Sequence, residues 1–379
     1  MSGYPLEGVK VLDLTQYVAG PYAAQVLADL GATVLKVERP QTGDVYRHQG
    51  PVFKKGESAS FLTLNRGKRS LELDLGSVTG HRRLHELLAE ADVLVENMRP
   101  GALAKFGVDY PSLAPRYPRL VYCSISAYGQ EGPLASAGGY DTTIQALSGL
   151  MAMTGHPGGP PAKIPVAALD FGSALYAVVG IQAALAQRER TGRGQWVQTS
   201  LLECAIAWLS MHVVTYLLGG EEPGPAGTRS PFFAPYEAYR TADGYLVVVG
   251  TGGRDAWGQL CRTLGLERLL DDPRFATNAD RVSSAEELRN ELEAVLSTRP
   301  SAEWEQALNE AGVACAPVQP LSAVLASEQM KVLGMLAHLE HPVAGQVPAV
   351  RLPVTLSDAP TTAQAPPPAL GADSERGFG

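Results

Sequence analysis

The sequence predicts a mixed α/β protein with a large, doubly wound, Rossmann-like domain and a small α+β domain. The first observation is a strand-helix-strand pattern near the N-terminus, which is typical of a parallel sheet. The second is length, because 379 residues exceed the roughly 250 to 300 at which one core stops growing. The third is a Gly/Pro-rich segment at 219–229, which indicates a domain boundary.

The large domain begins with alternating strands and helices. An apolar segment is followed by a segment with helical periodicity that ends at Gly31, and then by a second apolar segment. A second set of the same kind follows. In chain order we expect a strand at Val9–Leu14, a helix at Pro21–Leu30, a strand at Ala32–Val37, a helix at Gly80–Glu90, and strands at Asp92–Glu96 and Leu120–Ser126.

Two later segments, Phe171–Gln187 and Leu201–Leu218, are too continuously apolar for surface helices. We expect them to pack against the sheet or against another subunit. After the linker, the small domain shows a hairpin signal and two acidic helical stretches. These elements are Tyr236–Arg240 and Tyr245–Val249 around the turn, then Ala285–Leu296 and Ala302–Ala311.

The predicted domain limits follow from these signals. Residues 1–218 form the first part of the large domain, 219–318 the linker and small domain, and 319–379 a return segment that completes the large domain. Pro317–Val324 returns the chain, and the Pro/Ala-rich tail Pro360–Gly379 is expected to lie along a surface.

Composition excludes several classes of protein. Apolar residues make up 45% and charged residues 18%, with 40 glycines and 28 prolines, which is typical of a globular enzyme with many turns. The net charge of −8 disfavours nucleic-acid binding.

Cys123, Cys204, Cys261 and Cys315 have no metal-ligand spacing, so we expect no metal and reduced, buried thiols. Without a signal-peptide pattern or a run of 18 apolar residues, we expect a soluble cytoplasmic protein that binds no membrane.

One carboxylate, Asp170, stands at the mouth of the apolar helix that begins near Phe171. A carboxylate there can act as a nucleophile, and its segment offers no metal site, phosphate loop or Ser/His pair. The alternative is a helix N-cap, a position that Asp favours. Asp141, after Tyr140 and a glycine pair, has the same two interpretations. The Gly250–Gly253 loop could close over a ligand or simply form a turn.

The turn after the first strand, 16–21, holds one glycine where a dinucleotide fold has GxGxxG, so an NAD site is disfavoured. Glu38 could imitate a ribose-binding acid, although a solvated Glu at a strand end is commoner. Cations gather at predicted strand ends, where they could bind a phosphorylated ligand or could simply be solvated: Lys36, Arg39, Arg66, Lys68, Arg69, Arg99 and Lys105. His48, His156 and His212 have no partner at useful spacing and are interpreted as structural.

Taken together, motifs along nearly the whole chain resemble the class III CoA-transferases, the formyl-CoA and carnitine CoA-transferase group. The matching segments are Asp13-Leu-Thr, Ala19-Gly-Pro21, 27–32, Lys36-Val-Glu38, Gly43-Asp44, 65–70, Leu73-Asp74, 91–97, Arg99-Pro-Gly101, Ser124-Ile-Ser126, 128–130, Gly139-Tyr-Asp141, 148–151, Asp170 and 191–195.

The resemblance implies an interlocked, ring-like homodimer and a covalent reaction. Coenzyme A and acyl-CoA would be substrates, with no permanently bound cofactor. Asp170 would attack an acyl-CoA, plausibly succinyl-CoA, to give a mixed anhydride and then an aspartyl-CoA thioester, from which a small or medium carboxylic acid accepts CoA. Backbone amides of Gly252 and Gly253 would form the oxyanion site, with Asp141 and Tyr140 beside the nucleophile.

The resemblance also carries CoA contacts onto this chain, one position at a time. Val18 and Ala19 would line the pantetheine path, Arg39 and Lys105 would meet the phosphates, and Leu73 and Asn97 would border the adenine. Met98, Phe106 and Gln16 join the same CoA-binding set. Lys105 replaces an arginine and lacks its bidentate fork. Gln16 and Val18 stand where the formyl-CoA enzyme has His and Gln, which disfavours oxalate as the acid.

Two other functions stay open at this point. The α-methylacyl-CoA racemases share the fold but place a His where this chain has Tyr140, and a tyrosine with an ordinary pKa near 10 is a poor carbon base. A noncatalytic acyl-CoA-binding homologue would not need Asp170. The acceptor acid is open as well: Arg47, Arg229 and Arg254 could each bind a second carboxylate.

Overall fold

The computed structural model describes residues 3–251, 255–363 and 365–378, and it divides the chain into two compact units. The first unit comprises Met1–Met151, Lys163–Glu222 and Gln329–Gly379; the second comprises Ala152–Ala162 and Pro223–Glu328. The second unit therefore takes in the short segment 152–162 as well as the region after the Gly/Pro-rich linker, and the sequence analysis did not anticipate that segment.

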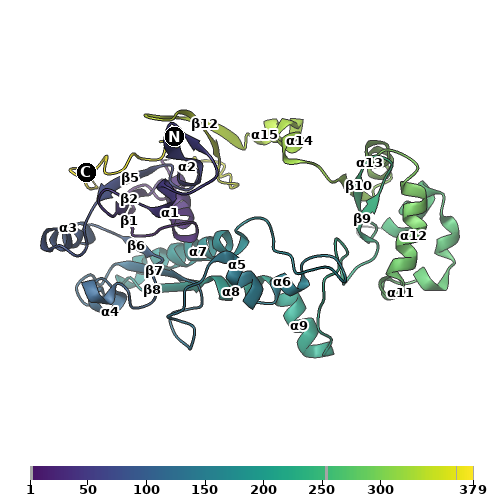
Figure 1. Ribbon diagram of the computed structural model, residues 1–379, viewed down its shortest axis with the longest axis horizontal. Coiled ribbons are helices and arrows are strands. Elements are labelled where there is room, and N and C mark those ends of the chain that lie inside the picture. The colour runs from purple at the N-terminus through teal and green to yellow at the C-terminus, as the bar shows by residue number, and fades with distance from the viewer. Residues whose placement is uncertain (1–2, 252–254, 364, 379) are drawn as a thin grey trace. The chain divides into compact units, whose positions relative to one another are not determined.

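A six-stranded, wholly parallel sheet forms the centre of the first unit (Figure 1). The strand order is β5-β2-β1-β6-β7-β8, so the order reverses between β1 and β6. In open α/β sheets, ligands bind outside the carboxyl ends of the strands at such a reversal. The strands are β1 Lys10–Asp13, β2 Thr33–Glu38, β5 Lys68–Glu72, β6 Val93–Glu96, β7 Val121–Ser126 and β8 Trp196–Ser200.

Both faces of this sheet are covered, as the apolar strands require. Successive residues of a strand point to opposite faces, so Val11 joins one apolar cluster with α1 and α7 while Leu12 joins another with α3. The mixed α/β fold with a parallel sheet is therefore confirmed. The helices of this unit are α1 Ala19–Asp29, α2 Ala59–Leu64, α3 Val78–Leu88, α4 Tyr110–Leu113, α5 Asp141–Leu147, α7 Ala168–Thr191, α8 Leu201–Trp208 and α9 Ser210–Gly219.

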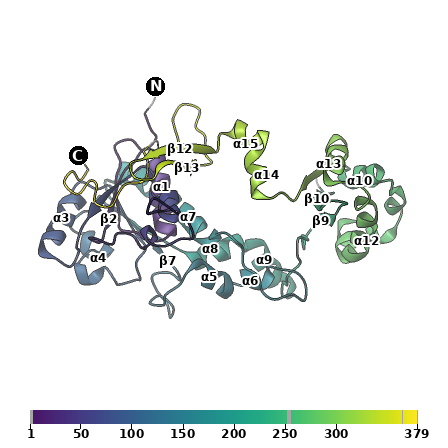
Figure 2. The ribbon, with the colours of Figure 1, turned by 45° about the horizontal axis from the view of Figure 1, so that its top comes forward.

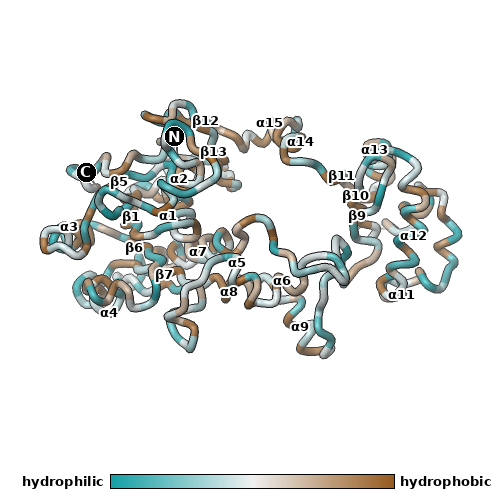
Figure 3. The backbone as a smooth tube through the Cα atoms, viewed as in Figure 1, coloured by the Kyte–Doolittle hydropathy of each residue, from teal (hydrophilic) through white to brown (hydrophobic). Residues whose placement is uncertain are grey.

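Helix α7 packs against α1, α8 and strands β7 and β8 (Figure 2). By length and composition alone it could cross a membrane, although half of its apolar window is buried inside the protein. A buried core helix passes the same test, so the finding is weak evidence for a membrane span. The predicted single helix at 201–218 is instead two helices, α8 and α9, bent by 64° at Leu209; Figure 3 shows hydrophobic residues along both.

The C-terminal part returns to the first unit through a hairpin of β12 Leu336–His341 and β13 Gly345–Val350. A smaller hairpin, β3 Phe53–Lys54 with β4 Glu57–Ser58, lies earlier in the chain. The tail then runs beside β5, where the Asp373 backbone N–H donates to the Ser70 carbonyl at 2.8 Å and the Ser70 backbone N–H donates to Asp373 Oδ2 at 3.1 Å. The described part of the tail thus lies along the surface, as expected.

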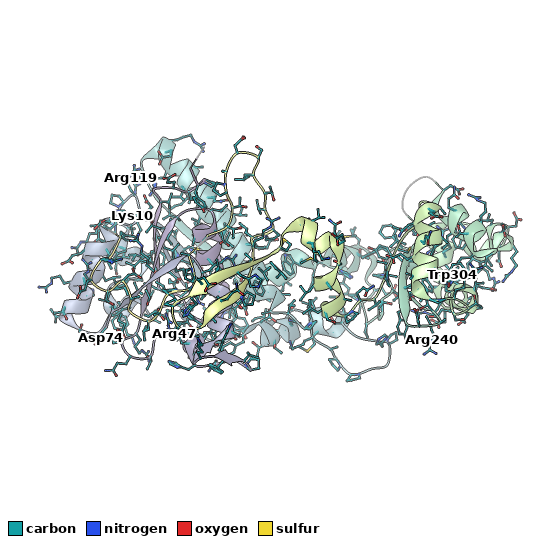
Figure 4. The ribbon with its side chains drawn as sticks, turned by 90° about the horizontal axis from the view of Figure 1, so that it is seen from above. Lys10, Arg47, Asp74, Arg119, Arg240 and Trp304 are labelled. Atoms are coloured by element: carbon teal, nitrogen blue, oxygen red, sulfur yellow. The ribbon has the colours of Figure 1, made fainter. Side chains whose placement is uncertain are left out.

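The second unit contains a three-stranded antiparallel sheet, β11-β10-β9, and a helical layer. The predicted hairpin is confirmed, and its core includes Tyr239 and Trp304, whose indole N–H donates to the Leu296 carbonyl at 2.8 Å. Trp304 and Arg240 are labelled in Figure 4. The elements are β9 Tyr236–Arg240, β10 Tyr245–Val249, β11 Ala314–Pro317, α10 Ala256–Leu264, α11 Asn278–Ser283, α12 Ala285–Leu296, α13 Ser301–Glu310 and α14 Leu321–Ala326; α6 Leu150–Met153 and α15 Glu328–Leu333 span the passages between units.

Candidate active site

Asp170 lies in the first turn of α7, two residues after the helix begins at Ala168. The N-cap position belongs to Ala167, which has no side chain able to cap. The alternative that Asp170 is an N-cap is therefore wrong. A helix start without its own cap leaves backbone N–H groups that need acceptors from elsewhere.

Asp141 supplies that acceptor from a different helix. Its Oδ2 accepts a hydrogen bond from the Leu169 backbone N–H at 2.7 Å and from that of Asp170 at 3.3 Å. Asp141 is the first residue of α5, and Tyr140 occupies the N-cap position, so the local N-cap alternative for Asp141 is also wrong. One buried carboxylate thus caps α7 across the structure.

Gln145 holds this carboxylate from the other side. The side-chain amide donates to Asp141 Oδ1 at 2.5 Å, and its oxygen accepts from the Ile164 backbone N–H at 2.9 Å. Gln145 is completely buried. The segment that leads into α7, the capping carboxylate and α5 are therefore joined in one hydrogen-bond network, in which the position of Asp170 is tightly determined.

The surroundings of Asp170 alter its acidity. Burial raises its pKa to about 7, and the negative charge of Asp141 acts in the same direction. The first turn of a helix favours an anion, but burial and the neighbouring carboxylate prevail here. A carboxyl group that is partly protonated near neutral pH is unusual and marks a candidate functional group.

Asp170 lines a cavity of about 190 Å³ together with three tyrosines, Tyr17, Tyr46 and Tyr140. The ring of Tyr17 meets those of Tyr46 and Tyr140 edge to face, with centroids 5.6 and 5.7 Å apart. Tyr17 adopts a left-handed backbone conformation with φ of 68°, which costs a non-glycine residue about 1 to 3 kcal/mol and tends to occur at functional sites. Val18, Ala19 and Asn97 line the same cavity.

A second cavity of about 310 Å³ lies at the carboxyl ends of β1, β2 and β5. It is lined by six of the residues expected to contact CoA: Gln16, Arg39, Leu73, Met98, Lys105 and Phe106. Met98 lines both cavities, so they adjoin. The predicted CoA-binding residues are thus distributed over two neighbouring cavities, one with exposed cations and apolar side chains and the other with the Asp170 carboxylate.

Hydrogen bonds join the loop after β1 to the loop after β6, where the strand order of the sheet reverses. Asn97, directly after β6, accepts from the Gln16 backbone N–H at 2.9 Å and donates to the Gln16 carbonyl at 2.7 Å. This pair of bonds is the kind that an adjacent backbone strand would make. In the structure Asn97 fixes the loop that carries Tyr17 and Val18.

Most of the other cations at the strand ends are not available to a ligand. Lys36 pairs with Asp44 at 2.8 Å, Lys68 with Asp13 at 2.8 Å, and all four side chains are fully buried. Arg66 pairs with Asp29 at 2.5 Å, also in the interior. For these three cations, both the phosphate-binding and the solvated interpretations are wrong, because buried carboxylates pair with them.

The Lys36–Asp44 pair supports the tyrosines. Asp44 Oδ1 accepts from the backbone N–H of Tyr46 at 2.9 Å and of Tyr17 at 3.4 Å. Sequence reasoning missed Tyr17, Tyr46 and Gln145 as site residues. Only Gln145 carried a signal, because it stands four residues after Asp141, which the sequence offered as a possible helix N-cap.

The candidate carboxylate-binding arginines have other partners. Arg47 is buried and bidentate to Glu38, with both N–O distances 2.7 Å, so it does not serve as a clamp. This pair also corrects the two interpretations of Glu38, which is neither solvated nor open to a ribose. Arg229 pairs with Glu286 at 2.7 Å and Glu237 at 3.5 Å in the second unit. Arg254, like Gly252 and Gly253, lies outside the described residues.

The chain is similar to known proteins over nearly its whole length. The model of CoA-transferase family III matches residues 6–374. The chain belongs to CoA-transferase family III. It is 39% identical over 97% of its length to a succinyl-CoA:glutarate CoA-transferase from Mus musculus, of which 84% is covered.

Members of this family are enzymes that use CoA thioesters as substrates, and this chain is a class III CoA-transferase. A succinate–glutarate CoA-transferase from Agrobacterium fabrum is 38% identical, with 97% of this chain and 93% of that protein covered. A crystal structure of a CAIB/BAIF family protein from Brucella suis is 38% identical, has a TM-score of 0.86 and covers 98% of both chains.

Proposed function

We propose that this CoA-transferase moves CoA from succinyl-CoA to a carboxylic acid through covalent intermediates on Asp170. The observation that carries the proposal is the placement of Asp170 in a cavity that adjoins, through Met98, the cavity lined by the expected CoA contacts. The choice of donor is motivated by the relatives named above, a succinyl-CoA:glutarate CoA-transferase and a succinate–glutarate CoA-transferase.

The reaction balances without any further reagent. An oxygen of ionised Asp170 attacks the thioester carbon, the C–S bond breaks, and CoA leaves as thiolate while a mixed anhydride forms. The thiolate then attacks the Asp170 carbonyl carbon, which releases the donor acid and leaves an aspartyl-CoA thioester. The acceptor carboxylate reverses both steps and departs as its CoA thioester, restoring the Asp170 carboxylate.

The residues around the two cavities suit the parts of CoA. Arg39 and Lys105 are exposed cations that can meet phosphate groups, and Leu73 and Phe106 offer apolar surface for a base. The narrower cavity, with Val18 and Ala19, would receive the pantetheine end. Such placement supplies most of the catalytic benefit by holding thioester and carboxylate together.

The isomerase alternative lacks a second base. Tyr140 is 62% exposed, and none of the residues described around the Asp170 cavity is a histidine. A carbon acid next to a thioester needs a base of pKa near 7 on each face, and Asp170 alone could serve only one. The transferase remains the better proposal.

We further propose that the functional form is a homodimer in the cytoplasm, whose two chains interlock. In the single chain, α9 has no buried residue, and Leu217 and Leu218 are 73% and 85% exposed. An apolar helix of this kind favours burial against another subunit. Light scattering of the purified protein tests this; a stable monomer at micromolar concentration would contradict it.

The test of the function is mass spectrometry after incubation with succinyl-CoA in the absence of acceptor, followed by hydroxylamine. We expect a hydroxamate on the Asp170 peptide, because hydroxylamine cleaves both the anhydride and the thioester. Asp170→Asn keeps the shape of the side chain, so it is the matched control and should remain unmodified. A wild-type enzyme that transfers CoA while Asp170 stays unmodified would refute the covalent route.

A further inference from the structure

Two walls of the 310 Å³ cavity come from different parts of the chain. The wall 73–76 leads from β5 into α3, and the wall 102–106 includes the 3₁₀ helix Ala104–Phe106. Both carry residues expected to meet the nucleotide part of CoA: Leu73 on the first, Lys105 and Phe106 on the second. A side chain that joins the two walls would therefore fix the shape of this cavity.

His81 makes such a connection. It lies on α3, four residues after the N-cap Ser77, and its Nε2 donates to the Phe106 carbonyl at 2.7 Å. In the part of the chain that the structure describes, no other hydrogen bond connects residues 73–88 with residues 99–108. A carbonyl oxygen can only accept, so Nε2 is the protonated nitrogen of the neutral ring and stays protonated in the charged ring. The bond is therefore present in both charge states of His81.

The His81 ring is itself held in place by two further side chains. His85, one helical turn further along α3, meets it edge to face with ring centroids 4.5 Å apart. The Tyr117 hydroxyl donates to the His85 carbonyl at 3.1 Å and lies 3.0 Å from His85 Nδ1. Because a phenol has only one proton to donate, this hydroxyl accepts from Nδ1–H. The ring that contacts His81 is thus fixed in orientation.

Each wall is also held within itself. On the first, Ser77 Oγ donates to the Asp74 carbonyl at 2.9 Å and accepts from the Gly80 N–H at 2.9 Å. A Cβ on Gly80 would stand 1.9 Å from the Asp74 carbonyl oxygen, so loop and helix are in close contact there. On the second, the Val108 N–H donates to the Leu103 carbonyl at 3.2 Å. Loss of the His81 bond should therefore change the separation of the walls without unfolding either one.

Phe106 links this bond to the cavity. Its carbonyl accepts from His81, and its side chain lines the cavity. The Lys105 ammonium group lies 4.7 Å from the centre of the Phe106 ring, so the cation, the ring and the carbonyl belong to one short turn. His81 itself lines a different, open cavity with His85 and Tyr117, and not the 310 Å³ cavity.

We propose that His81 is a positioning residue, which holds the wall 102–106 in place for the nucleotide part of CoA. It acts through Phe106 and Lys105 and touches neither the substrate nor Asp170. The inference rests on the proposed function and adds to it a residue that determines affinity for CoA but takes no part in the chemistry. Preorganisation of this kind raises affinity because the free protein has already ordered its binding surface.

Two amide variants of His81 form a matched pair for the experiment. The NH₂ group of Gln lies as many bonds from Cα as histidine Nε2, whereas that of Asn corresponds to Nδ1. His81→Gln can therefore still donate to the Phe106 carbonyl, and His81→Asn cannot reach it. His81→Leu has no donor and is a better helix former, so it should behave as His81→Asn and replaces that variant if its urea midpoint is lowered.

The measurement follows formation of the Asp170 adduct by rapid-quench mass spectrometry over a range of donor concentrations. The donors are succinyl-CoA and succinyl-pantetheine, which lacks the nucleotide. We expect His81→Asn to raise the half-saturating concentration of succinyl-CoA roughly 2- to 10-fold, the range for one neutral hydrogen bond, at an unchanged limiting rate. With succinyl-pantetheine the variant should equal wild type, and His81→Gln should equal wild type with both donors.

The other outcomes would overturn the inference in distinguishable ways. Equal losses with both donors would mean that His81 affects the site as a whole and not the nucleotide wall. A loss in His81→Gln as large as in His81→Asn would mean that the imidazole ring itself, and not the bond to Phe106, is required. Wild-type constants in every variant would show that the bond is dispensable, while the proposed function stands. A wild-type enzyme that forms no adduct with succinyl-CoA would refute the proposed function, and this inference with it.

Discussion

The Asp141 carboxylate accepts a hydrogen bond from the Asp170 backbone N–H at 3.3 Å, although 29 residues separate them in the chain. The same Asp141 charge contributes to the raised pKa of the Asp170 carboxyl group. One side chain therefore holds the turn that carries the proposed nucleophile and also adjusts its acidity. Gln145 completes the arrangement by occupying the second oxygen of Asp141.

The first prediction concerns the exchange of carboxylate and amide between Asp141 and Gln145. In Asp141→Asn, the new NH₂ group faces either the α7 amides or the Gln145 NH₂ group, so one donor is unpaired and stability should fall by about 1 to 3 kcal/mol. In Asp141→Asn/Gln145→Glu, every bond can reform: Asn accepts from Leu169 and donates to Glu, which accepts from Ile164. Urea unfolding should show recovery to within about 1 kcal/mol of wild type.

Gln145→Glu alone is the control for this exchange. It places two carboxylates in hydrogen-bond contact without a donor between them, so it should be destabilised as much as Asp141→Asn or more. If the double variant is merely as unstable as the sum of the single variants, the network is not coupled in the way the structure indicates.

The second prediction is the pH dependence of the covalent step. Asp170 must be ionised to attack, and its pKa is about 7 because of burial and the Asp141 charge. Formation of the CoA adduct from succinyl-CoA should therefore rise with pH through neutrality and level off above about pH 8. Rapid-quench mass spectrometry at several pH values measures this directly.

Asp141→Asn removes the neighbouring negative charge, so the pKa of Asp170 should fall and the rise of the rate with pH should move to lower pH. A lower maximal rate at high pH would report that Asp170 is less well positioned. A limb that stays in place would mean that burial alone sets the acidity. A flat profile between pH 5 and 8 in wild type would contradict the raised pKa.

The third prediction concerns Arg47, which the sequence offered as a substrate clamp. Its guanidinium binds Glu38 through two bonds of 2.7 Å and lies 3.7 Å from the centre of the Phe61 ring. Arg47→Ala leaves Glu38 buried without its cation and should cost about 3 to 5 kcal/mol in urea unfolding. Adding Glu38→Gln should restore part of this loss.

Arg47→Ala should leave the ratio of activities on succinyl-CoA and butyryl-CoA unchanged wherever the protein is folded. A large fall in that ratio, with the free energy of unfolding unchanged, would mean that Arg47 contacts the substrate after all.

The sequence predicted those parts of the fold that have a simple periodic signal. β1, α1, β2, β6, β7 and the β9–β10 hairpin lie within a few residues of the expected segments, because each combines an apolar pattern with a clear turn. It missed β5, whose sequence Lys-Arg-Ser-Leu-Glu reads as a charged loop. Lys68 can lie buried in that strand because its ammonium group pairs with Asp13, 55 residues away, and also donates to the Pro21 carbonyl and to Asn65.

The site residues, like the fold, divide into those that the sequence could place and those that it could not. Asp170 and the expected CoA contacts could be placed because a motif marks them, and the structure brings them to two adjoining cavities. Partners that arise from tertiary packing could not be placed: the capping of α7 by Asp141, the support of two tyrosines by Asp44, and the pairing of Arg47 with Glu38. Each of these depends on which side chains a distant segment presents, and periodicity carries no information about that.

The fourth prediction concerns Glu96, a buried carboxyl group at the end of β6. Burial raises its pKa to about 7, against the hydrogen bonds from Ser124 and from the Met98 N–H that favour ionisation. The folded protein therefore binds this proton more tightly than the unfolded chain, whose ordinary value is 4.5. The contribution of Glu96 to stability is complete at low pH and is lost as pH rises from about 4.5 through 7, by at most about 1.4 kcal/mol per pH unit.

Glu96→Gln is the matched variant, because its oxygen can still accept from Met98 while nothing titrates. Relative to wild type, the variant should gain stability between pH 5 and pH 8, measured by urea unfolding at both values. Asp170 titrates in the same range in both proteins, so its effect cancels in the comparison. An identical pH dependence in wild type and Glu96→Gln would mean that Glu96 keeps an ordinary pKa, with water reaching it through the cavity beside Arg99 and Tyr122.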